Sequence, residues 1–302
     1  MSFALCVLSC GLASASGEPD AFALTGIGAR AGGMGNAFIG LSDEMESIYY
    51  NPAGLGNLVQ SGVTAMYQAP ALSTSREFLA FNKRWNSPVI PGSFGFGWLR
   101  LQSTSIELTS TDEQILGTDT LTNDLFLWGA GVHPWEHVSL GAAMKYFRFA
   151  FDGFSESGLG VDLGVHAQYN PIRFGVALTD VGGTILRGSS IAPSAPDASD
   201  RVPMRLRPGA GLTLRDPLDW PILVNLDVDG LIKLQEAQDA RVFSGAEVWG
   251  FQERFAIRSG FMQGNGPTLG FGARWGIFQF DYSFLLSLNL QDEHRLSTTF
   301  RF

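Results

Sequence analysis

The chain has 302 residues, of which 45% are hydrophobic, 12% aromatic and only 16% charged, and its formal net charge is −9 at pH 7. This charge argues against nucleic acid as a partner, because phosphate binding requires clustered Lys and Arg, and the 20 basic residues here form no run longer than the pair Lys83-Arg84. Beyond the first residues no apolar run reaches the roughly 18 residues of a membrane-spanning helix, so a membrane form of this chain would be a β-barrel.

The first residues predict a signal peptide spanning residues 1–17. An apolar core from Phe3 to Leu12 precedes Ala13-Ser14-Ala15, a small-x-small pattern typical of cleavage by signal peptidase. A short hydrophobic strand or tail is the alternative. Both cysteines, Cys6 and Cys10, lie in this segment, so the mature chain would contain no thiol, although lipid attachment at Cys10 is a further alternative.

Residues 18–60 are predicted to form a compact plug. Six glycines fall between Gly26 and Gly40, and glycine lets a backbone fold back on itself in little space. A short amphipathic turn follows at Ser42–Tyr50, and Pro52 ends it. The residues that mark the plug are Gly32, Gly33, Gly35, Asn51, Pro52 and Ala53.

Residues 61–302 show the period of two that is typical of strands. In Gly158–Asn170, for example, Leu159 and Val165 share one face with other apolar residues, and Asp162 lies on the other. Such alternation predicts strands that separate two unlike environments. Fourteen segments follow the pattern, an even number as in bacterial barrels: 61–70, 76–85, 93–102, 123–133, 137–151, 158–170, 172–181, 204–215, 221–233, 240–251, 253–263, 266–275, 277–288 and 293–302.

The connections between these segments alternate in length. If both termini are periplasmic, the expected periplasmic turns are mostly short, and the extracellular ones include the long polar segments Ser103–Thr122 and Val181–Pro203. Outer-membrane barrels show this alternation. Aromatic residues near the segment ends predict interfacial girdles, among them Tyr67, Trp98, Trp128, Trp249, Trp275 and Tyr282.

The polar face of the strands places charged residues in the barrel lumen. The candidates are Arg173, Arg205, Arg207, Asp227, Asp229, Glu247, Arg258, Arg274 and Asp281. Buried ions are costly unless they pair, so these groups are expected either to clamp the plug or to guide the head group of a ligand.

Catalytic and metal-binding patterns are weak. The four histidines, His133, His137, His166 and His294, are dispersed, and none has a partner at metal-ligand spacing. A Gly-x-Ser-x-Gly elbow, which an esterase would use, does not occur in the sequence. The chain is therefore expected to be neither an enzyme nor a cofactor-binding protein.

Motifs at both ends of the chain resemble one known family. Three motifs resemble the start of the PorV/PorQ (UPF0164) branch of FadL-like outer-membrane proteins: Gly28-Ala29-Arg30-Ala31-Gly32-Gly33-Met34-Gly35-Asn36-Ala37-Phe38, Ser42-Asp43-Glu44 and Tyr50-Asn51-Pro52-Ala53-Gly54-Leu55. Asp281-Tyr282-Ser283, His294-Arg295-Leu296-Ser297 and Phe302 are similar to its end. The resemblance implies a transmembrane antiparallel β-barrel of about fourteen strands whose N-terminal hatch carries the Asn-Pro-Ala motif.

The resemblance also implies a location and two functions. The location is the bacterial outer membrane, in contact with its lipids, with Phe300 and Phe302 as the signal for the barrel-assembly machinery. The first function is plug-gated passage of hydrophobic or amphipathic small molecules. The alternative is a PorV-like accessory role in type IX protein secretion, in which the barrel docks exported proteins.

Overall fold

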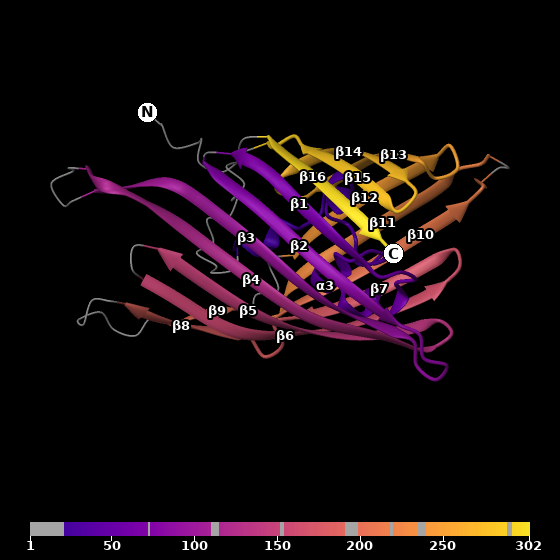
Figure 1. Cartoon of the computed structure of the whole chain (residues 1–302), viewed down its shortest axis with the longest axis horizontal. Helices are drawn as coiled ribbons and strands as arrows, with labels where there is room; N and C mark the ends of the chain where they lie inside the picture. Colours follow the sequence, from indigo (N-terminus) through magenta and orange to yellow (C-terminus); the bar gives the residue numbers. More distant parts are fainter. Residues whose placement is uncertain are drawn as a thin grey trace, which may run out of the picture.

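A computed structural model describes residues 21–71, 73–109, 115–151, 154–190, 199–217, 220–234, 240–288 and 292–302. Within these ranges fourteen strands close into one antiparallel barrel, in which the first strand pairs with the last, Val63 opposite Phe300. Figure 1 shows the barrel from the side with its strands strongly tilted. The expected fold class, an all-β antiparallel barrel of fourteen strands with a small N-terminal plug, is confirmed.

The barrel strands are β1 (Gly62–Ala71), β2 (Thr74–Trp85), β3 (Gly92–Thr109), β4 (Ile115–Trp135), β5 (Val138–Phe151), β6 (Phe154–Tyr169), β7 (Ile172–Thr179), β10 (Arg205–Arg215), β11 (Leu223–Lys233), β12 (Ala240–Gly250), β13 (Phe255–Met262), β14 (Gly266–Trp275), β15 (Phe278–Leu285) and β16 (Glu293–Arg301). Two further strands, β8 (Thr184–Ser190) and β9 (Ser199–Val202), form a hairpin that pairs with the start of β6. We call the end of the barrel where β1 begins and β16 ends the turn end, and the opposite end the loop end; they lie to the right and left in Figure 1.

The two long polar segments expected to be loops both contain regular strands, so that prediction was wrong. β3 runs to Thr109 and β4 begins at Ile115, with a register shift between Ser103 and Ile106. The segment after β7 likewise contains β8 and β9. Thr is common in strands, so the polar composition of these segments did not distinguish an extended hairpin from a loop.

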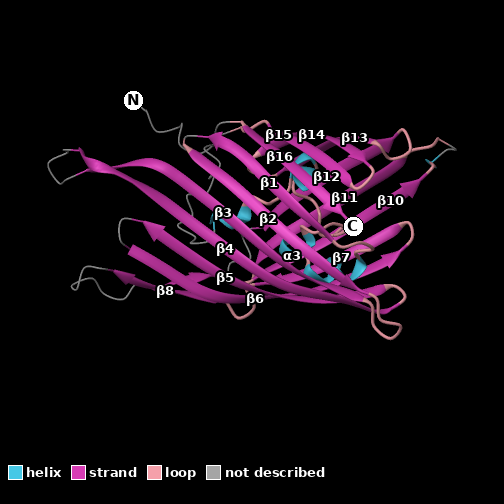
Figure 2. Cartoon of the chain, in the orientation of Figure 1, coloured by secondary structure: helices cyan, strands magenta, loops and turns pink. Residues whose placement is uncertain are grey.

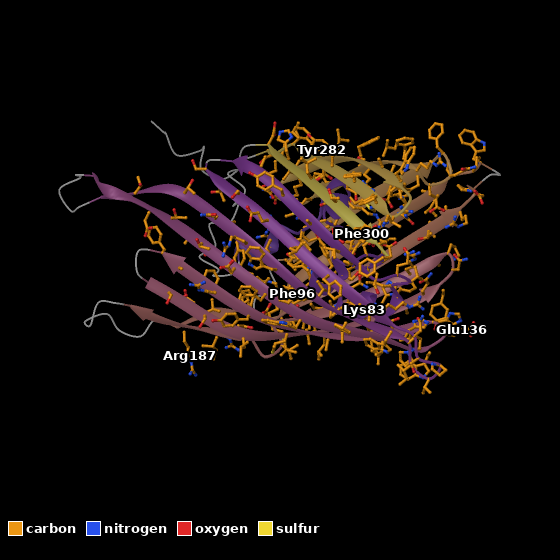
Figure 3. The ribbon with its side chains drawn as sticks, in the orientation of Figure 1. Lys83, Phe96, Glu136, Arg187, Tyr282 and Phe300 are labelled. Atoms are coloured by element: carbon orange, nitrogen blue, oxygen red, sulfur yellow. The ribbon has the colours of Figure 1, made fainter. Side chains whose placement is uncertain are left out.

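The outer face of the barrel is apolar, and the inner face is polar or closely packed. Leu159, Phe271 and Phe280 are 63%, 47% and 52% exposed, whereas Asp162 and Glu247 are 1% and 0% exposed. Figure 3 shows side chains of the outer wall, including Phe96 and Phe300, with Glu136 at the turn end. No helix among the described residues is long and apolar enough to cross a membrane.

One of the aromatic residues expected at an interface lies inside the barrel. Trp249 is 1% exposed, and its ring lies between two guanidinium groups, 5.3 Å from Arg258 and 4.4 Å from Arg274. Trp275, by contrast, is 77% exposed at the turn end. Alternation by two places Trp249 on the same face as Glu247. Its position near a strand end therefore did not predict its location, whereas the alternation did.

The plug lies inside the barrel, where Figure 2 shows its helices enclosed by strands. It consists of the short helices α1 (Ala21–Leu24), α2 (Ala29–Gly33) and α3 (Ser47–Tyr50) and the 3-10 helix η1 (Pro52–Asn57). Apolar plug residues such as Ile27, Met34 and Leu55 are fully buried. Such short helices are marginal in isolation, so the plug takes its stability from the wall.

Candidate functional site

The strongest contact between plug and wall is an ion cluster around Glu247 of β12. The Nε and Nη2 atoms of Arg30 donate to its two carboxylate oxygens at 2.8 and 2.7 Å. Arg258 of β13 donates to the same carboxylate at 2.6 Å, and its Nη2 lies 2.8 Å from Asp281 of β15. All these side chains are buried, and bidentate charge-assisted bonds of this kind are among the strongest hydrogen bonds in proteins.

Two aspartates of β11 bind the backbone of the plug. Asp229 Oδ2 accepts the N–H groups of Phe38 and Ile39 at 2.5 and 2.8 Å, and Asp227 Oδ2 accepts that of Leu41 at 2.9 Å. These donors belong to an irregular loop that has no strand partner for them. The carboxylates therefore replace the hydrogen bonds that regular structure would supply.

The Asn51-Pro52-Ala53 motif joins the plug to β6. Asn51 Nδ2 donates to the Val165 carbonyl at 3.1 Å, while its Oδ1 accepts the Ala53 N–H at 3.2 Å. Pro52 occupies the first position of η1, where its missing N–H costs nothing. Asn51 thus caps the helix that follows it and also bonds the inner wall.

His166 of β6 holds the plug at two points. Its Nε2 lies 2.8 Å from the Gly40 carbonyl, and its Nδ1 lies 2.9 Å from Asn57 Nδ2. Because a carbonyl only accepts and an amide nitrogen only donates, the ring is neutral with its proton on Nε2. Asn57 in turn accepts from Ser139 of β5.

The glycines of the plug motif lie where backbone meets wall. A Cβ on Gly32 would lie 2.7 Å from Ser283 Oγ, and one on Gly33 would lie 2.9 Å from the Cα of Gly270. Gly35 has φ +65°, and a Cβ there would lie 2.6 Å from the Phe261 backbone nitrogen. Any larger residue at Gly35 would face both steric overlap and an unfavourable backbone conformation.

The remaining candidate lumen residues all lie on the inner face. Arg173 reaches Asp43 at 3.3 Å, and Arg274 packs over Trp249. Arg207 lies over the rings of Tyr49 and Tyr50, at 5.8 and 5.2 Å from their centroids. Arg205 is 1% exposed. Most of these contacts are with the plug or with its ionic partners, which favours the clamp interpretation over a lining for ligand head groups.

Two acidic residues of the plug have shifted pKa values. For Asp43, burial opposes ionisation, but Arg30 and Arg173 outweigh it and lower the pKa to about 2. For Glu46, burial and then the charge of Glu44 raise the pKa to about 8. Glu46 therefore keeps its proton at neutral pH, whereas Asp43 is ionised.

The raised pKa of Glu46 predicts a loss of stability as the pH rises. Between its ordinary pKa of 4.5 and about 8, the unfolded chain has released the proton that the folded chain keeps. This residue therefore lowers the free energy of unfolding by up to about 1.4 kcal/mol for each pH unit in that window. Besides Glu44, Asp281 also raises the Glu46 pKa and Arg301 lowers it.

The variant Glu46→Gln lacks this titration, so its stability relative to the wild type should increase steadily from about pH 5 to about pH 8. Urea unfolding in detergent micelles, followed by tryptophan fluorescence at both pH values, measures the difference. A difference that stays constant across the window would show that Glu46 is ionised in the folded protein.

The loop-end half of the lumen combines buried apolar side chains with buried charged ones such as Arg76, Lys145 and Arg205. Buried side chains from both sides of the barrel face this space or the plug below it: Phe78, Leu99, Leu125, Leu127, Phe147, Leu186, Val202, Leu231, Phe243, Met262 and Leu285. Phe22 of α1 meets Phe149 edge to face at 5.6 Å. Porin interiors are polar and filled with water, so this lining suits an apolar occupant.

The wall is interrupted between β7 and β8. Asp180, Gly182 and Gly183 all have positive φ, 53°, 80° and 80°, and regular pairing with β6 stops there, although the Val181 N–H still donates to the Val161 carbonyl at 2.9 Å. Lys145 of β5 closes the interruption from inside, with its Nζ 2.9 Å from Asp162 and 2.8 Å from Asp180. The two ion pairs of Lys145 thus join β5 to β6 and to the segment after β7, where the regular strand pairing ends.

Two cavities open at the turn end on either side of the linker from the plug to β1. One, of about 330 Å³, is lined by charged residues of plug and wall, including Asp43, Arg173 and Arg301. The other, of about 430 Å³, is lined by Gly56 and Asn57 of η1 with His133 and other rim residues. Leu58 and Val59 line both cavities.

Several residues of the site were not predicted. Arg30, Asp43 and Glu44 are the plug partners of the wall charges, but the plug has no period from which an orientation can be inferred. His166 could have been found, since alternation puts it on the same face as Asp162. In the described part of the chain, no three His, Cys, Asp or Glu side chains are grouped to hold a metal ion.

No protein-family model matches the chain, and no curated protein matches its sequence. Solved structures do match. The toluene transporter TbuX of Ralstonia pickettii is similar with a TM-score of 0.64 and 15% identity, over 93% of this chain and 100% of that chain. The toluene transporter TodX of Pseudomonas putida has a TM-score of 0.63 and 10% identity, over 91% of this chain and 98% of that chain. A FadL homologue from Pseudomonas aeruginosa has a TM-score of 0.58 and 10% identity, over 90% of this chain and 97% of that chain.

These likenesses concern the fold and do not test the PorV/PorQ resemblance, which stays a prediction. The chain has the plugged, closed barrel fold of FadL-like hydrocarbon transporters.

Proposed function

We propose that this protein lets hydrophobic or amphipathic small molecules cross the outer membrane of a diderm bacterium, with the plug as its gate. The buried apolar side chains in the loop-end half of the lumen carry the proposal, because an aqueous pore has no use for buried Phe78, Leu125 and Phe147. That the fold is shared with two toluene transporters supports it.

The outer surface supports the membrane location. Large apolar residues are exposed all around the barrel, among them Phe174 at 50%, Ile257 at 65% and Leu269 at 58%. Soluble monomers rarely expose apolar patches of more than a few hundred Å². Lipid covers these residues, the loop end faces outward, and the C-terminus lies on the periplasmic side.

Uptake of 1-N-phenylnaphthylamine, an uncharged fluorescent aromatic amine, tests the proposal. Cells that carry the protein in their outer membrane should take up the probe several-fold faster than matched cells without it, because the lipopolysaccharide leaflet slows the probe in the control. Equal rates at equal cell density would contradict the proposal. Excision of Gly26–Gly56 should raise the conductance of the purified barrel in planar bilayers, since these residues fill the lumen.

The second hypothesis, docking of exported proteins in type IX secretion, stays a prediction. The hairpin of β8 and β9 (Thr184–Ser190 and Ser199–Val202) would be its docking surface. Recovery of a secreted protein with the wild-type barrel, and its loss when the hairpin is shortened, would favour this role over transport.

A further inference from the structure

The plug contacts the two halves of the wall through different chemistry. Against β10–β16 it uses the Glu247 ion cluster and the backbone hydrogen bonds to Asp227 and Asp229. Against β3 and β4 it uses Ile48 and Leu55, which are 1% and 0% exposed. The contacts of these two side chains are dispersion between apolar groups, which lack fixed direction, while Ser93 of β3 donates to the Leu55 carbonyl at 2.5 Å.

Ile48 and Leu55 lie on a strip of wall that has few side chains of its own. A Cβ on Gly129 would lie 2.9 Å from Ile48 Cγ1 and 3.2 Å from Leu55 Cδ1, and one on Gly95 would lie 3.5 Å from Ile48 Cδ1. Gly95 and Gly129 face each other across the β3–β4 pair. We call this surface the apolar strip and define it by Gly95, Gly97, Leu99, Leu125, Leu127 and Gly129, none of which is charged.

The apolar strip connects the two ends of the lumen. At its loop end a small cavity of about 30 Å³ is lined by Leu125, Phe147 and Tyr49 and also by charged residues, including Lys145 and Arg207. At its turn end Gly131 packs against Gly56, and Gly56 lines the cavity of about 430 Å³ that opens beside the linker. From Leu125 to Gly131 the distance along β4 is about 20 Å at the usual rise per residue. The space between these cavities is occupied by the side chains of Ile48 and Leu55 and, at Gly131, by the backbone of Leu55 and Gly56.

We infer that a hydrophobic molecule passes the plug along the apolar strip, and that Ile48 and Leu55 are the side chains that move aside for it. Along the apolar strip itself no ion pair has to separate, and the passing molecule replaces the apolar contacts that it displaces. Passage on the β10–β16 side would break buried charge-assisted bonds, and the interruption near Asp180 is closed by Lys145. This inference rests on the proposed function and assigns its route.

The test compares three truncations of equally buried plug residues. Ile48→Ala and Leu55→Ala remove side chains from the apolar strip. Leu41→Ala is the matched control: Leu41 is also 0% exposed and also lies against a wall glycine, Gly211 of β10, where a Cβ would lie 3.4 Å from Leu41 Cδ2. Each variant is checked for the heat-dependent shift in gel mobility of a folded barrel, and its uptake of 1-N-phenylnaphthylamine is measured in cells.

Ile48→Ala and Leu55→Ala should speed uptake several-fold over the wild type, and Leu41→Ala should leave it unchanged. Leu55→Met, which refills the volume, should return the rate to that of the wild type. Gly97→Ala should slow uptake, because its Cβ would lie 3.2 Å from Leu127 and 3.4 Å from Ile48. Similar acceleration by Leu41→Ala and Leu55→Ala, or none by either strip truncation, would overturn the route while the proposed function stands. A wild type that does not speed uptake overturns the proposed function and the route together.

Discussion

Replacing Glu247 with Ala is expected to free the plug from its seat. The carboxylate accepts from Arg30, Arg258 and Asn225, and it is fully buried. Its removal leaves the buried guanidinium groups of Arg30 and Arg258 without this negative partner. Removing one partner of a buried ion pair lowers the free energy of unfolding by about 3–5 kcal/mol. Because Arg30 belongs to the plug and Arg258 to the wall, much of that cost falls on the contact between them.

Conductance in planar bilayers and protease access to the plug measure the effect. Glu247→Ala should open the lumen to ions and expose the plug to cleavage, and its unfolding in urea should begin at a lower concentration. Glu253→Ala is the control, since Glu253 pairs with Arg215 at the solvent-exposed turn end and exposed pairs contribute about 0–1 kcal/mol. Equal behaviour of the two variants would show that the ion cluster does not hold the plug.

The wall of the barrel could be predicted from the sequence because alternation by two is a local property. A strand such as β6 reports its own inner and outer faces, and Leu159 and Asp162 lie where the pattern puts them. The fourteen strands and the inward position of Glu247 follow from the same rule. Trp249 was predicted at the membrane interface because it is aromatic and lies near a strand end. Alternation already placed it on the inner face with Glu247, so alternation is the more reliable of the two signals.

The partners inside the barrel could not be predicted, because they join residues far apart in the chain. Glu247 lies 217 residues from Arg30, and Asp229 lies 191 residues from Phe38. The plug has neither helical nor strand periodicity over most of its length, so no pattern orients its side chains. Its contacts depend on the closed barrel that surrounds it, which only the three-dimensional structure supplies.

The high glycine content of the chain has a physical reason that the sequence did not reveal. Gly131, Gly141 and Gly164 of β4–β6 lie directly against the backbone of Pro52–Gly56 or against Asn51. With no side chain on the wall, backbone packs against backbone, which leaves no layer of side chains through which water could pass. Glycine on the inner face is therefore what lets a plug of fewer than fifty residues fill a barrel of fourteen strands.

Gly141→Ala tests that reason and is expected to displace the plug without unfolding the barrel. The new Cβ would lie 2.2 Å from the Pro52 carbonyl carbon and 2.3 Å from the Ala53 nitrogen. Both are backbone atoms of η1 and cannot rotate away, so the Asn51-Pro52-Ala53 segment must shift. The strand itself accepts alanine, which is more favourable there than glycine by about 0.5–1 kcal/mol.

The matched control is Gly250→Ala, because a Cβ on Gly250 of β12 would have nothing within 4 Å of it. Both variants should show the gel-mobility shift of a folded barrel, and only Gly141→Ala should conduct, at a level approaching that of the chain without Gly26–Gly56. Conductance of Gly141→Ala at the wild-type level would mean that the η1 segment can move within a closed lumen. The seal would then depend on the ion cluster at Glu247 and not on close packing of backbone against wall.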